Sequence, residues 1–452
     1  MSAGSANAHP RGWALALSLG GPEHGRTACV QYGDELMKRA TLIRRIAGLI
    51  ALLMGVPILT LGVTGGAASA SGGGKWTLHT GNGIIRSYEI AEGSDGALWF
   101  TNFDGNQSSI GRITTGGTVT SYTDPSIDDP YSITAGPDGA LWFTQSNLIG
   151  RITTAGVITS FTSPGINYAD YITEGPDGAL WFTNQSNSIG RITTTGVVSN
   201  YKNPSLDDPM GIVAGPDGAL WFTNLFGRSI GRITTAGVIT SYTSPSINYP
   251  SEITKGPDGA LWFTNDPSID RSPKPGSIGR ITTAGLVTTY TVAGIRDPHA
   301  IAAGPDGALW FTSVELGRRD RGKTAIRRIT TGGAITTFIV TGINMAPDIA
   351  AGPDGALWFT SGANSIGRIT TNVTPAITIL TPSSGGVGAQ VAITGLNLLG
   401  ASVVAFNGTP AAIFSDKAKK IVVDVPAGAT TGFISVTTSV GTATSAAAFT
   451  VT

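Results

Sequence analysis

Apart from His79, which precedes the first repeat, His299 is the one histidine in the repeated part of this chain. An imidazole titrates near neutral pH and can act as a general base that removes a proton from a bound molecule. The carboxyl group of Asp348 could serve as a substitute base or bind a metal ion. Alternatively, His299 is a hydrogen-bonded residue of purely structural importance. His299 and Asp348 are the candidate catalytic residues, and whether the protein is an enzyme stays open.

Two loops that are longer than their counterparts in the other repeats could wall a pocket. One spans residues 266–276 and contains three prolines. The other spans residues 314–324 and contains Arg318 and Arg319 among its four basic residues. Guanidinium groups bind carboxylate or phosphate through paired hydrogen bonds, so a ligand with such a group would fit there. The alternative is that both loops are solvated and bind nothing.

The scaffold that must position these residues is a sequence repeat. The unit Gly-Pro-Asp-Gly-Ala-Leu-Trp-Phe-Thr occurs seven times, with Ser in place of Pro in the first copy. Its tryptophans are Trp99, Trp142, Trp181, Trp221, Trp262, Trp310 and Trp358. Successive copies are 39 to 48 residues apart. A period near 40 built from short β-prone segments is typical of a β-propeller with one blade per repeat. We therefore predict an all-β protein with a seven-bladed β-propeller over residues 75–371.

Each repeat has the turns and the alternation of four antiparallel strands. In the third repeat the turn is Pro176-Asp177-Gly178, because Pro presets φ and Gly accepts a positive φ. The adjacent Trp and Phe of a strand point to opposite faces of the sheet, and neighbouring blades bury both faces. The last repeat lacks a fourth strand of its own. Residues 75–80 alternate like a strand and are predicted to supply it, which would close the ring.

The polar residues that recur in every repeat are predicted to build blades rather than sites. The Asp of each Pro-Asp-Gly resembles an array of ligands, but a short carboxylate readily bonds to its own turn backbone. The Arg that recurs once per repeat is expected to form a structural pair or to face a partner at the surface. These arginines are Arg112, Arg151, Arg191, Arg232, Arg280, Arg328 and Arg368.

Composition excludes several classes of partner. Lys plus Arg and Asp plus Glu each total 29, so no net field favours nucleic acid or an anionic membrane. Charged residues make up 13% of the chain, about half the usual share. The single cysteine, Cys29, lies upstream of the predicted propeller, which rules out a disulfide framework and a cysteine-based metal site there.

The N-terminal region has the pattern of an export signal. Basic residues at 38, 39, 44 and 45 precede an apolar run over residues 46–63, and Ala68-Ser69-Ala70 is a small-residue cleavage signature. We predict a signal peptide over residues 37–70, preceded by an unstructured segment over residues 1–36. An uncleaved anchor is the alternative, and it would be the chain's one contact with a membrane. The protein is thus expected to be secreted or associated with the cell envelope.

The period stops near residue 372, and a different β pattern follows. Short strands with Gly, Pro and Asn between them suggest an immunoglobulin-like sandwich over residues 375–452. Its opening resembles the IPT/TIG family at Ile379, Pro382, Gly385, Gly388, Val391, Ile393, Gly395 and Asn397. Such domains are usually spacers or interaction modules, so the resemblance implies no catalysis.

The repeat unit, together with Ser-Ile-Gly-Arg-Ile-Thr-Thr, resembles the virginiamycin B lyase (streptogramin lyase) family over residues 76–371. The resemblance implies a propeller that opens a cyclic depsipeptide antibiotic by elimination at its ester, with a histidine base and magnesium. It places the active site at one channel end, where the innermost strands begin. In this chain that point lies five residues before the first Gly of each unit, where residue types differ between blades. The residues there are Tyr88, Tyr131, Asp170, Met210, Ser251, His299 and Pro347.

Two of these positions match the family, and the seventh blade departs from it. Tyr88 and His299 match a tyrosine and a histidine that contact substrate. Met345-Ala346-Pro347 stands where the family has Glu-Pro-His, and a second metal-binding glutamate falls at about Gly362. The expected metal carboxylates and the expected base are therefore absent. No metal or other cofactor is expected, and magnesium would be needed only by a lyase.

These patterns favour an exported binding or scaffold protein. Its unknown ligand, a small molecule, glycan or peptide, would bind at the channel mouth. The candidate binding residues are Tyr88, Tyr131, Asp170, Met210, Ser251, His299, Arg318 and Arg319. Tyr88 and Tyr131 could stack on a sugar or simply fill the channel. One alternative is a carbon–oxygen lyase with His299 as a relocated base. Another is a structural adhesin with a protein partner for its C-terminal domain.

Overall fold

The computed structural model describes eleven segments of the chain: residues 68–69, 75–104, 107–270, 274–291, 295–315, 323–343, 345–371, 374–398, 400–417, 419–438 and 441–452. The predicted signal peptide and upstream segment lie outside these residues, except for Ala68 and Ser69. The described residues form β-strands and one short 3-10 helix, Pro267–Asp270. None of their helices has the length and apolar character needed to cross a membrane.

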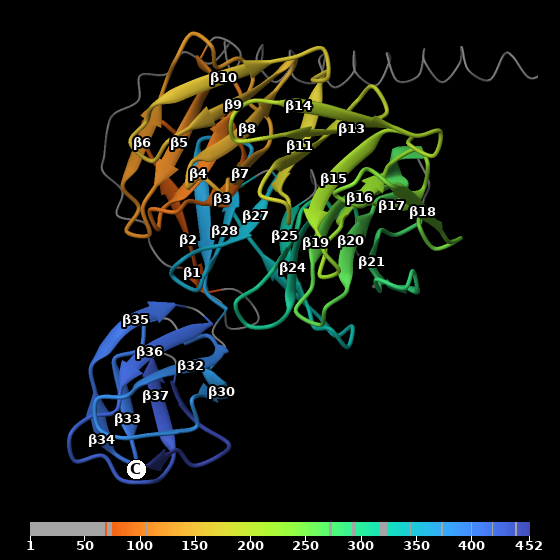
Figure 1. Ribbon diagram of the computed structural model, residues 1–452. Coiled ribbons are helices and arrows are strands. Elements are labelled where there is room, and N and C mark those ends of the chain that lie inside the picture. Colours follow the sequence, from red (N-terminus) through yellow and green to blue (C-terminus); the bar gives the residue numbers. More distant parts are fainter. Residues whose placement is uncertain are drawn as a thin grey trace, which may run out of the picture. The chain divides into compact units, whose positions relative to one another are not determined.

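Consecutive antiparallel sheets run through the repeats, one sheet per repeat (Figure 1). The first sheet contains β3 (Ser87–Glu92), β4 (Leu98–Asn102), β5 (Ser109–Ile113) and β6 (Val119–Tyr122). The second contains β7 (Ile133–Ala135), β8 (Leu141–Gln145), β9 (Leu148–Ile152) and β10 (Ile158–Thr162). The third contains β11 (Ala169–Glu174), β12 (Leu180–Asn184), β13 (Ser188–Ile192) and β14 (Val198–Lys202).

The remaining repeats follow the same order of strands. The fourth sheet contains β15 (Pro209–Ala214), β16 (Leu220–Asn224), β17 (Ser229–Ile233) and β18 (Ile239–Thr243). The fifth contains β19 (Pro250–Lys255), β20 (Leu261–Asn265), β21 (Ser277–Ile281) and β22 (Val287–Tyr290). The sixth contains β23 (Ile301–Ala303), β24 (Leu309–Glu315), β25 (Lys323–Ile329) and β26 (Ile335–Ile339). The seventh contains β27 (Ile349–Ala351), β28 (Leu357–Thr360) and β29 (Ser365–Ile369).

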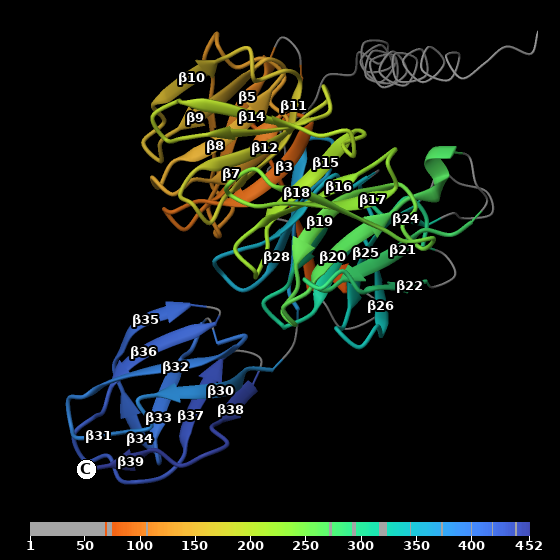
Figure 2. The same ribbon diagram turned by 45° about the vertical axis from the view of Figure 1, so that its right-hand side comes forward.

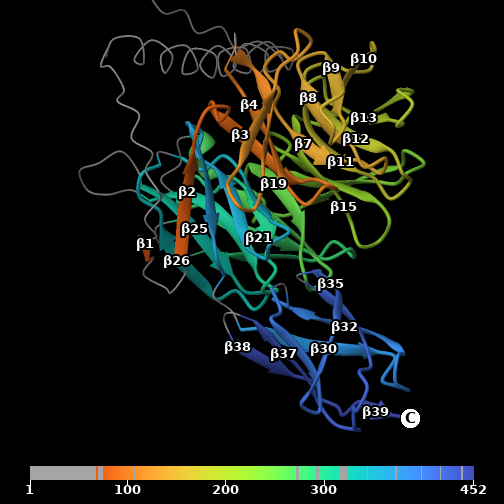
Figure 3. The same cartoon turned by 90° about the vertical axis from the view of Figure 1, so that its left-hand side faces the viewer.

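The sheets form a closed ring. The first strands of successive repeats contact one another in chain order, and β27 contacts β3. The seventh sheet is completed by β2 (Lys75–Thr80), which pairs antiparallel with β29, and the two-residue β1 (Ala68–Ser69) pairs with β2. Figure 3 shows the orange-red β2 beside strands from the end of the propeller. The predicted closing strand is therefore confirmed: a segment from before the first repeat occupies the outer position of the last.

Each blade is built around the Trp and Phe of its second strand. All seven tryptophans and the phenylalanines that follow them are fully buried. Burial of one Trp removes about 200 Å² from water, which contributes on the order of 3–5 kcal/mol as an upper bound. In the third blade a Cβ on Gly190 would stand 2.1 Å from ring atoms of Phe182. The glycine of Ser-Ile-Gly-Arg-Ile therefore makes room for the phenylalanine.

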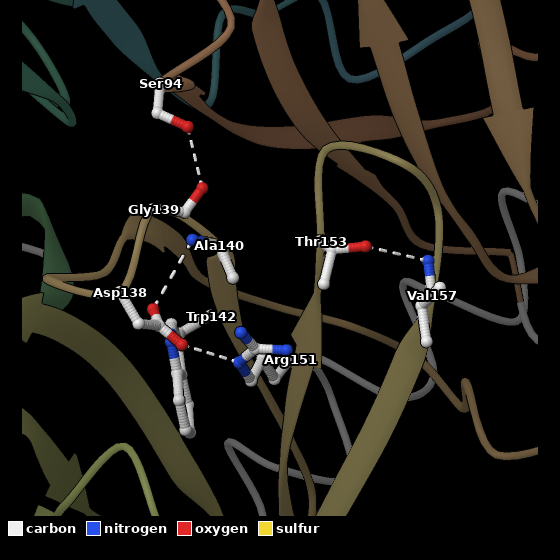
Figure 4. Close-up of polar contacts among 8 residues, drawn as sticks. All are labelled: Ser94, Asp138, Gly139, Ala140, Trp142, Arg151, Thr153 and Val157. Atoms are coloured by element: carbon white, nitrogen blue, oxygen red, sulfur yellow. Dashed lines mark hydrogen bonds and ion pairs between the residues drawn. The ribbon is translucent and has the colours of Figure 1, made fainter.

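The repeated Asp, Trp and Arg of each blade form one cluster, shown for the second blade in Figure 4. Asp138 accepts a hydrogen bond from Trp142 Nε1 at 3.0 Å and pairs with Arg151 Nε at 2.6 Å. It also accepts the Ala140 N–H at 3.3 Å, so the predicted bond to its own turn exists. The same Trp–Asp–Arg contacts recur in every blade. The prediction that these residues are structural is confirmed.

The C-terminal residues form a β-sandwich with its own core (Figure 2). One sheet has the order β30 (Ala376–Thr381), β32 (Gln390–Leu396), β36 (Lys420–Asp424), β35 (Ile413–Lys417). The other has the order β34 (Thr409–Ala411), β33 (Val403–Phe406), β37 (Ile434–Thr438), β38 (Gly441–Thr444). β31 (Ser384–Gly385) pairs parallel with β39 (Thr450–Val451). Phe406 and Phe449 pack edge to face in the core, with centroids 5.1 Å apart. The predicted fold, a propeller followed by an immunoglobulin-like sandwich, is confirmed.

Candidate functional site

The residues that vary between blades lie where the innermost strands begin. In β3, β11, β15 and β19 the pairing register shifts at this point, so the variable residue is released from the regular ladder. Six residues, each two positions upstream of a variable residue, have positive φ angles between 47° and 56°: Arg86, Asp129, Tyr168, Asp208, Tyr249 and Asp297. This conformation is costly for side chains other than glycine. The repetition of this backbone conformation around the ring indicates that the fold imposes it where the chain enters each innermost strand.

In five of the seven repeats the threonine that ends the unit connects neighbouring blades. Thr101 accepts a hydrogen bond from Glu89 N at 3.0 Å and donates one to the carbonyl of Tyr131, in the next blade, at 2.9 Å. The corresponding donations run from Thr144 to Asp170, Thr223 to Ser251, Thr264 to His299 and Thr360 to Tyr88. The last of these joins the end of the propeller to its beginning. The scaffold thus fixes the backbone of the candidate residues, and only their side chains differ.

His299 makes the connection between the sixth and seventh blades. Its Nδ1 lies 2.9 Å from the carbonyl oxygen of Pro347. A carbonyl can only accept, so Nδ1 carries the proton and Nε2 keeps its lone pair. Burial lowers the pKa of His299, against a smaller opposing effect of this hydrogen bond. The imidazole is therefore neutral near pH 7, in the form that can accept a proton or a hydrogen bond at Nε2.

A pocket lies beside this histidine. Its lining residues are Asp297, His299, Thr312, Ser313, Val314, Met345 and Ala346. They come from the starts of the sixth and seventh innermost strands and from the end of β24. Val314, Met345 and Ala346 are apolar, and the other four lining residues supply a carboxylate, an imidazole and two hydroxyls. With a volume of about 50 Å³, this space takes one part of a ligand, an apolar group with a few polar atoms.

Two carboxyl groups adjoin the pocket. Asp266, which is 7% exposed, hydrogen-bonds the side chain of Asp297 and accepts the Ser268 N–H at 3.0 Å. Burial, reinforced by the neighbouring Asp297, raises the pKa of Asp266 to about 6.

Three tyrosines from the first, second and third blades form a cluster of their own. The hydroxyls of Tyr88 and Tyr131 lie 2.9 Å apart, and their ring centroids are 4.5 Å apart. Tyr171 packs edge-on against Tyr131 at 5.6 Å. Burial raises the pKa of both Tyr131 and Tyr171 well above 10. The hydroxyls of Tyr131 and Tyr171 are therefore neutral, and the three rings pack on one another.

Three acids, Glu89, Glu252 and Asp348, stand one residue further along their strands and influence one another electrostatically. Glu89 accepts the Ile133 N–H at 3.0 Å, and Asp348 accepts the Ile90 N–H at 2.9 Å. Each of these bonds joins a blade to its neighbour. Burial raises the pKa of Glu89 well above 4.5, that of Glu252 to about 8 and that of Asp348 to about 7. Asp348, predicted as a substitute base, thus contacts the backbone of the first blade.

The structure places the other predicted residues as follows. Asp170 accepts a hydrogen bond from Gln185 Nε2 at 3.0 Å. Met210 packs against the core between the third and fourth blades. The Ser251 hydroxyl lies 2.9 Å from that of Thr264. Arg318 and Arg319 lie outside the described residues. Within the list of candidates, His299 is the one that lines the pocket, and Tyr88 contacts Tyr131 instead.

Apart from Asp348, sequence reasoning did not name the residues of the second variable series as candidates. Glu89, Tyr171, Glu252 and Asp348 each follow a predicted position by one residue. Their counterparts in the other repeats are Ser132, Gly211 and Ala300. The same signal, variation on a constant scaffold, would have identified this series. Alternation along a strand suggests that only one of two adjacent residues faces the channel. In the first, third, fourth and fifth blades, however, the pairing register shifts across these two positions, so strict alternation does not apply there.

The residues present do not fit the magnesium ion that the resemblance implies. Among the described residues, no group of three or more His, Cys, Asp or Glu side chains is placed to hold a metal ion. Met345 and Ala346 offer no oxygen side chain, and Gly362 offers no side chain at all. A magnesium site requires carboxylate oxygens, which these positions lack. That the protein uses no cofactor remains a prediction.

The ring of four-stranded sheets followed by a separate sandwich defines a β-propeller protein with an immunoglobulin-like C-terminal domain. The virginiamycin B lyase family model matches residues 60–266 and 249–396, and the chain belongs to that family. The IPT/TIG domain model matches residues 375–452. Among curated proteins, none matches the chain in sequence.

Solved structures agree with this assignment. Virginiamycin B lyase from Staphylococcus aureus is 35% identical, with a TM-score of 0.58; the match covers 66% of this chain and 99% of that one. A streptogramin B lyase structure is 31% identical, with a TM-score of 0.58, 66% of this chain and 97% of that chain being covered. A catalytically inactive S. aureus virginiamycin B lyase with quinupristin is 35% identical, with a TM-score of 0.57 and coverage of 65% and 99%.

Proposed function

We propose that this protein is an exported binding protein whose ligand occupies the pocket beside His299. The observation that supports this proposal is the composition of that pocket. A neutral imidazole of defined tautomer, two hydroxyls and the apolar Met345 and Ala346 face one space between two blades. A ligand that combines apolar groups with carbonyl and N–H groups, such as a modified peptide, matches this lining.

The proposal is that this protein binds a ligand but does not carry out the elimination reaction of the family. The positions that the resemblance assigns to the metal and the base carry Met345, Ala346, Pro347 and Gly362. The described residues offer no metal cluster in their place. The pocket wall formed by the sixth blade, in contrast, includes His299. Binding is therefore the function that the remaining side chains support best.

Quinupristin is the first ligand to test, because a related propeller is known with it. The purified protein would be titrated with quinupristin by calorimetry and, separately, incubated with it with and without magnesium. Mass spectrometry would then distinguish the ring from its opened product. We expect binding that weakens at least tenfold in His299→Ala, without ring opening. If no binding is seen, a glycan and peptide array would extend the search.

One observation favours a lyase as the second candidate. His299 has its Nδ1 proton engaged by Pro347, so Nε2 is oriented and unprotonated, as a general base must be. In an elimination, Nε2 would take a proton from carbon, that C–H electron pair would form a double bond, and the ester oxygen would leave. Magnesium-independent ring opening that disappears in His299→Ala would establish this candidate and remove the preference for binding alone.

A further inference from the structure

The sixth blade carries Ala325 and Arg327 at positions where no other repeat has Ala or Arg, and it shares Ser313 with Ser361 of the seventh blade. Four blades have an Asn after Trp-Phe-Thr whose Nδ2 donates to the serine of Ser-Ile-Gly-Arg-Ile, as Asn184 does to Ser188 at 3.1 Å. In the sixth blade the corresponding residues are Ser313 and Ala325. The glycine of the motif is replaced by Arg327, which pairs with Phe311 in the sheet.

Arg327 is a buried cation within a sheet. Its side chain is 2% exposed, its Nε donates to Ser313 Oγ at 2.9 Å, and its Nη1 donates to Thr337 Oγ1 at 2.8 Å. The other six repeats carry Gly at this position: Gly111, Gly150, Gly190, Gly231, Gly279 and Gly367. Burial of an arginine is expensive, so a position at which glycine would suffice for the fold is a candidate for function.

The contact determines what Ser313 offers to the pocket. Ser313 is 3% exposed and belongs to the pocket lining. A serine hydroxyl has one proton and two lone pairs, and the guanidinium can only donate. The hydroxyl therefore uses a lone pair toward Arg327, and its proton is directed elsewhere. A charged donor at the oxygen also strengthens the hydroxyl as a donor in its turn.

We propose that Arg327 is a positioning residue that orients Ser313 to donate a hydrogen bond to an acceptor oxygen of the ligand, such as an amide or ester carbonyl. The proposal rests on the proposed binding function and names the chemical group that this part of the pocket takes. Thr312 supplies a second hydroxyl to the same lining. At this blade junction the carbonyl of Pro347 already receives the His299 Nδ1 proton. The pocket wall from Thr312 to Ser313 is therefore selective for acceptors over cations.

The test uses Met210 and Met345, two of the five methionines of the chain, as reporters. Met345 lines the pocket, whereas Met210 packs in the core between the third and fourth blades. With ¹³C-methyl methionine in the full chain, N-methylacetamide and methylammonium chloride would be titrated separately into the protein. We expect N-methylacetamide to shift the Met345 signal in a saturable way and to leave Met210 unchanged, while methylammonium has a weaker effect.

Variants identify the role of Arg327. Arg327→Gly restores the residue of the other repeats and is expected to fold, and we predict at least fivefold weaker binding of N-methylacetamide. Ser313→Ala should weaken binding equally, and the double variant no further, because both act through one hydrogen bond. Ser361→Ala is the matched control: it occupies the same repeat position in the seventh blade, outside the pocket, and should bind like wild type.

The outcomes separate this inference from the proposed function. Equal binding by Arg327→Gly and wild type, additive effects of the two substitutions, or preference for methylammonium would each overturn the role of Arg327. If quinupristin or an array ligand nevertheless binds at Met345, the proposed binding function stands without a role for Arg327. If neither the amide nor any larger ligand perturbs Met345, both proposals fail.

Discussion

His299 in the sixth blade donates its Nδ1 proton to the carbonyl of Pro347 in the seventh, 2.9 Å away. At five other junctions a threonine hydroxyl makes the corresponding bond. One ring nitrogen of His299 therefore supports the scaffold, while the other is directed away from it. The two roles can be separated by substitution because they belong to different atoms.

The amide of asparagine can imitate Nδ1 but not Nε2. We expect His299→Ala to lower the free energy of unfolding by about 1–2 kcal/mol, through loss of the junction bond and of packing. His299→Asn should recover most of this loss, since its Nδ2 can donate to Pro347 O, yet it should bind ligand as poorly as the alanine variant. Urea denaturation and calorimetry measure the two effects. An asparagine variant that binds like wild type would show that Nε2 is not used.

Stability should fall as the pH rises through neutrality. Burial raises the pKa of Glu252 to about 8, from 4.5 when it is unfolded. Between these values the folded state binds more protons than the unfolded state, so its advantage is complete below about pH 4.5 and is lost as pH rises toward 8. We expect a decrease on the order of 2–4 kcal/mol between pH 5 and pH 8 from urea denaturation.

Glu252→Gln isolates this effect. The amide keeps the shape and cannot ionise, so the variant should lose much of the slope and be more stable than wild type at pH 8. Glu174→Gln, at the exposed end of an innermost strand, is the control and should keep the wild-type slope. Asp348, whose pKa burial raises to about 7, leaves a residual slope in the Glu252 variant. If the stability of Glu252→Gln depended on pH as that of the wild type does, Glu252 would not be the cause of the slope.

The repeats made the fold predictable, while the site was only partly so. The spacing of Trp99 and its six counterparts identified the blades, and the missing last strand identified residues 75–80 as the closing segment. The hydrogen bonds of Glu89 and Asp348 to the following blade were not predictable, because contacts across a blade junction have no sequence period. Arg327 was overlooked for a different reason: it replaces glycine inside a motif that was interpreted as constant.

Closure of the ring predicts a large effect of a short deletion. His79 on β2 stacks on Trp358 of the seventh blade, with centroids 5.3 Å apart, and Trp76 is buried in the core of that region. A chain that begins at residue 81 leaves β29 as an open edge and uncovers both contacts. We expect its melting temperature to fall by about 10 °C or more relative to a chain that begins at Lys75. Equal melting of the two chains would mean that β2 does not contribute to the ring.

The Asp–Trp–Arg cluster predicts graded losses of stability for two substitutions of its aspartate, which we describe for the fourth blade. Asp217 accepts Trp221 Nε1 at 2.9 Å and pairs with Arg232 Nε at 2.7 Å. Desolvation acts to raise the pKa of Asp217, but the hydrogen bonds from Trp221 and Arg232 outweigh it and lower the pKa below 3.8. Asp217→Ala leaves the buried indole N–H without its acceptor and should cost about 2 kcal/mol.

Asp217→Asn retains an acceptor for Trp221 and removes the charge, so we expect a loss of about 1 kcal/mol or less, as for a partly exposed ion pair. Because the folded pKa is depressed, the contribution of the carboxylate is present above about pH 4 and disappears as the pH falls further. The difference between wild type and Asp217→Asn in urea denaturation should therefore shrink at acidic pH. If the difference in stability between wild type and Asp217→Asn stayed constant from pH 7 to pH 3, the cluster would stabilise the blade by packing rather than by charge.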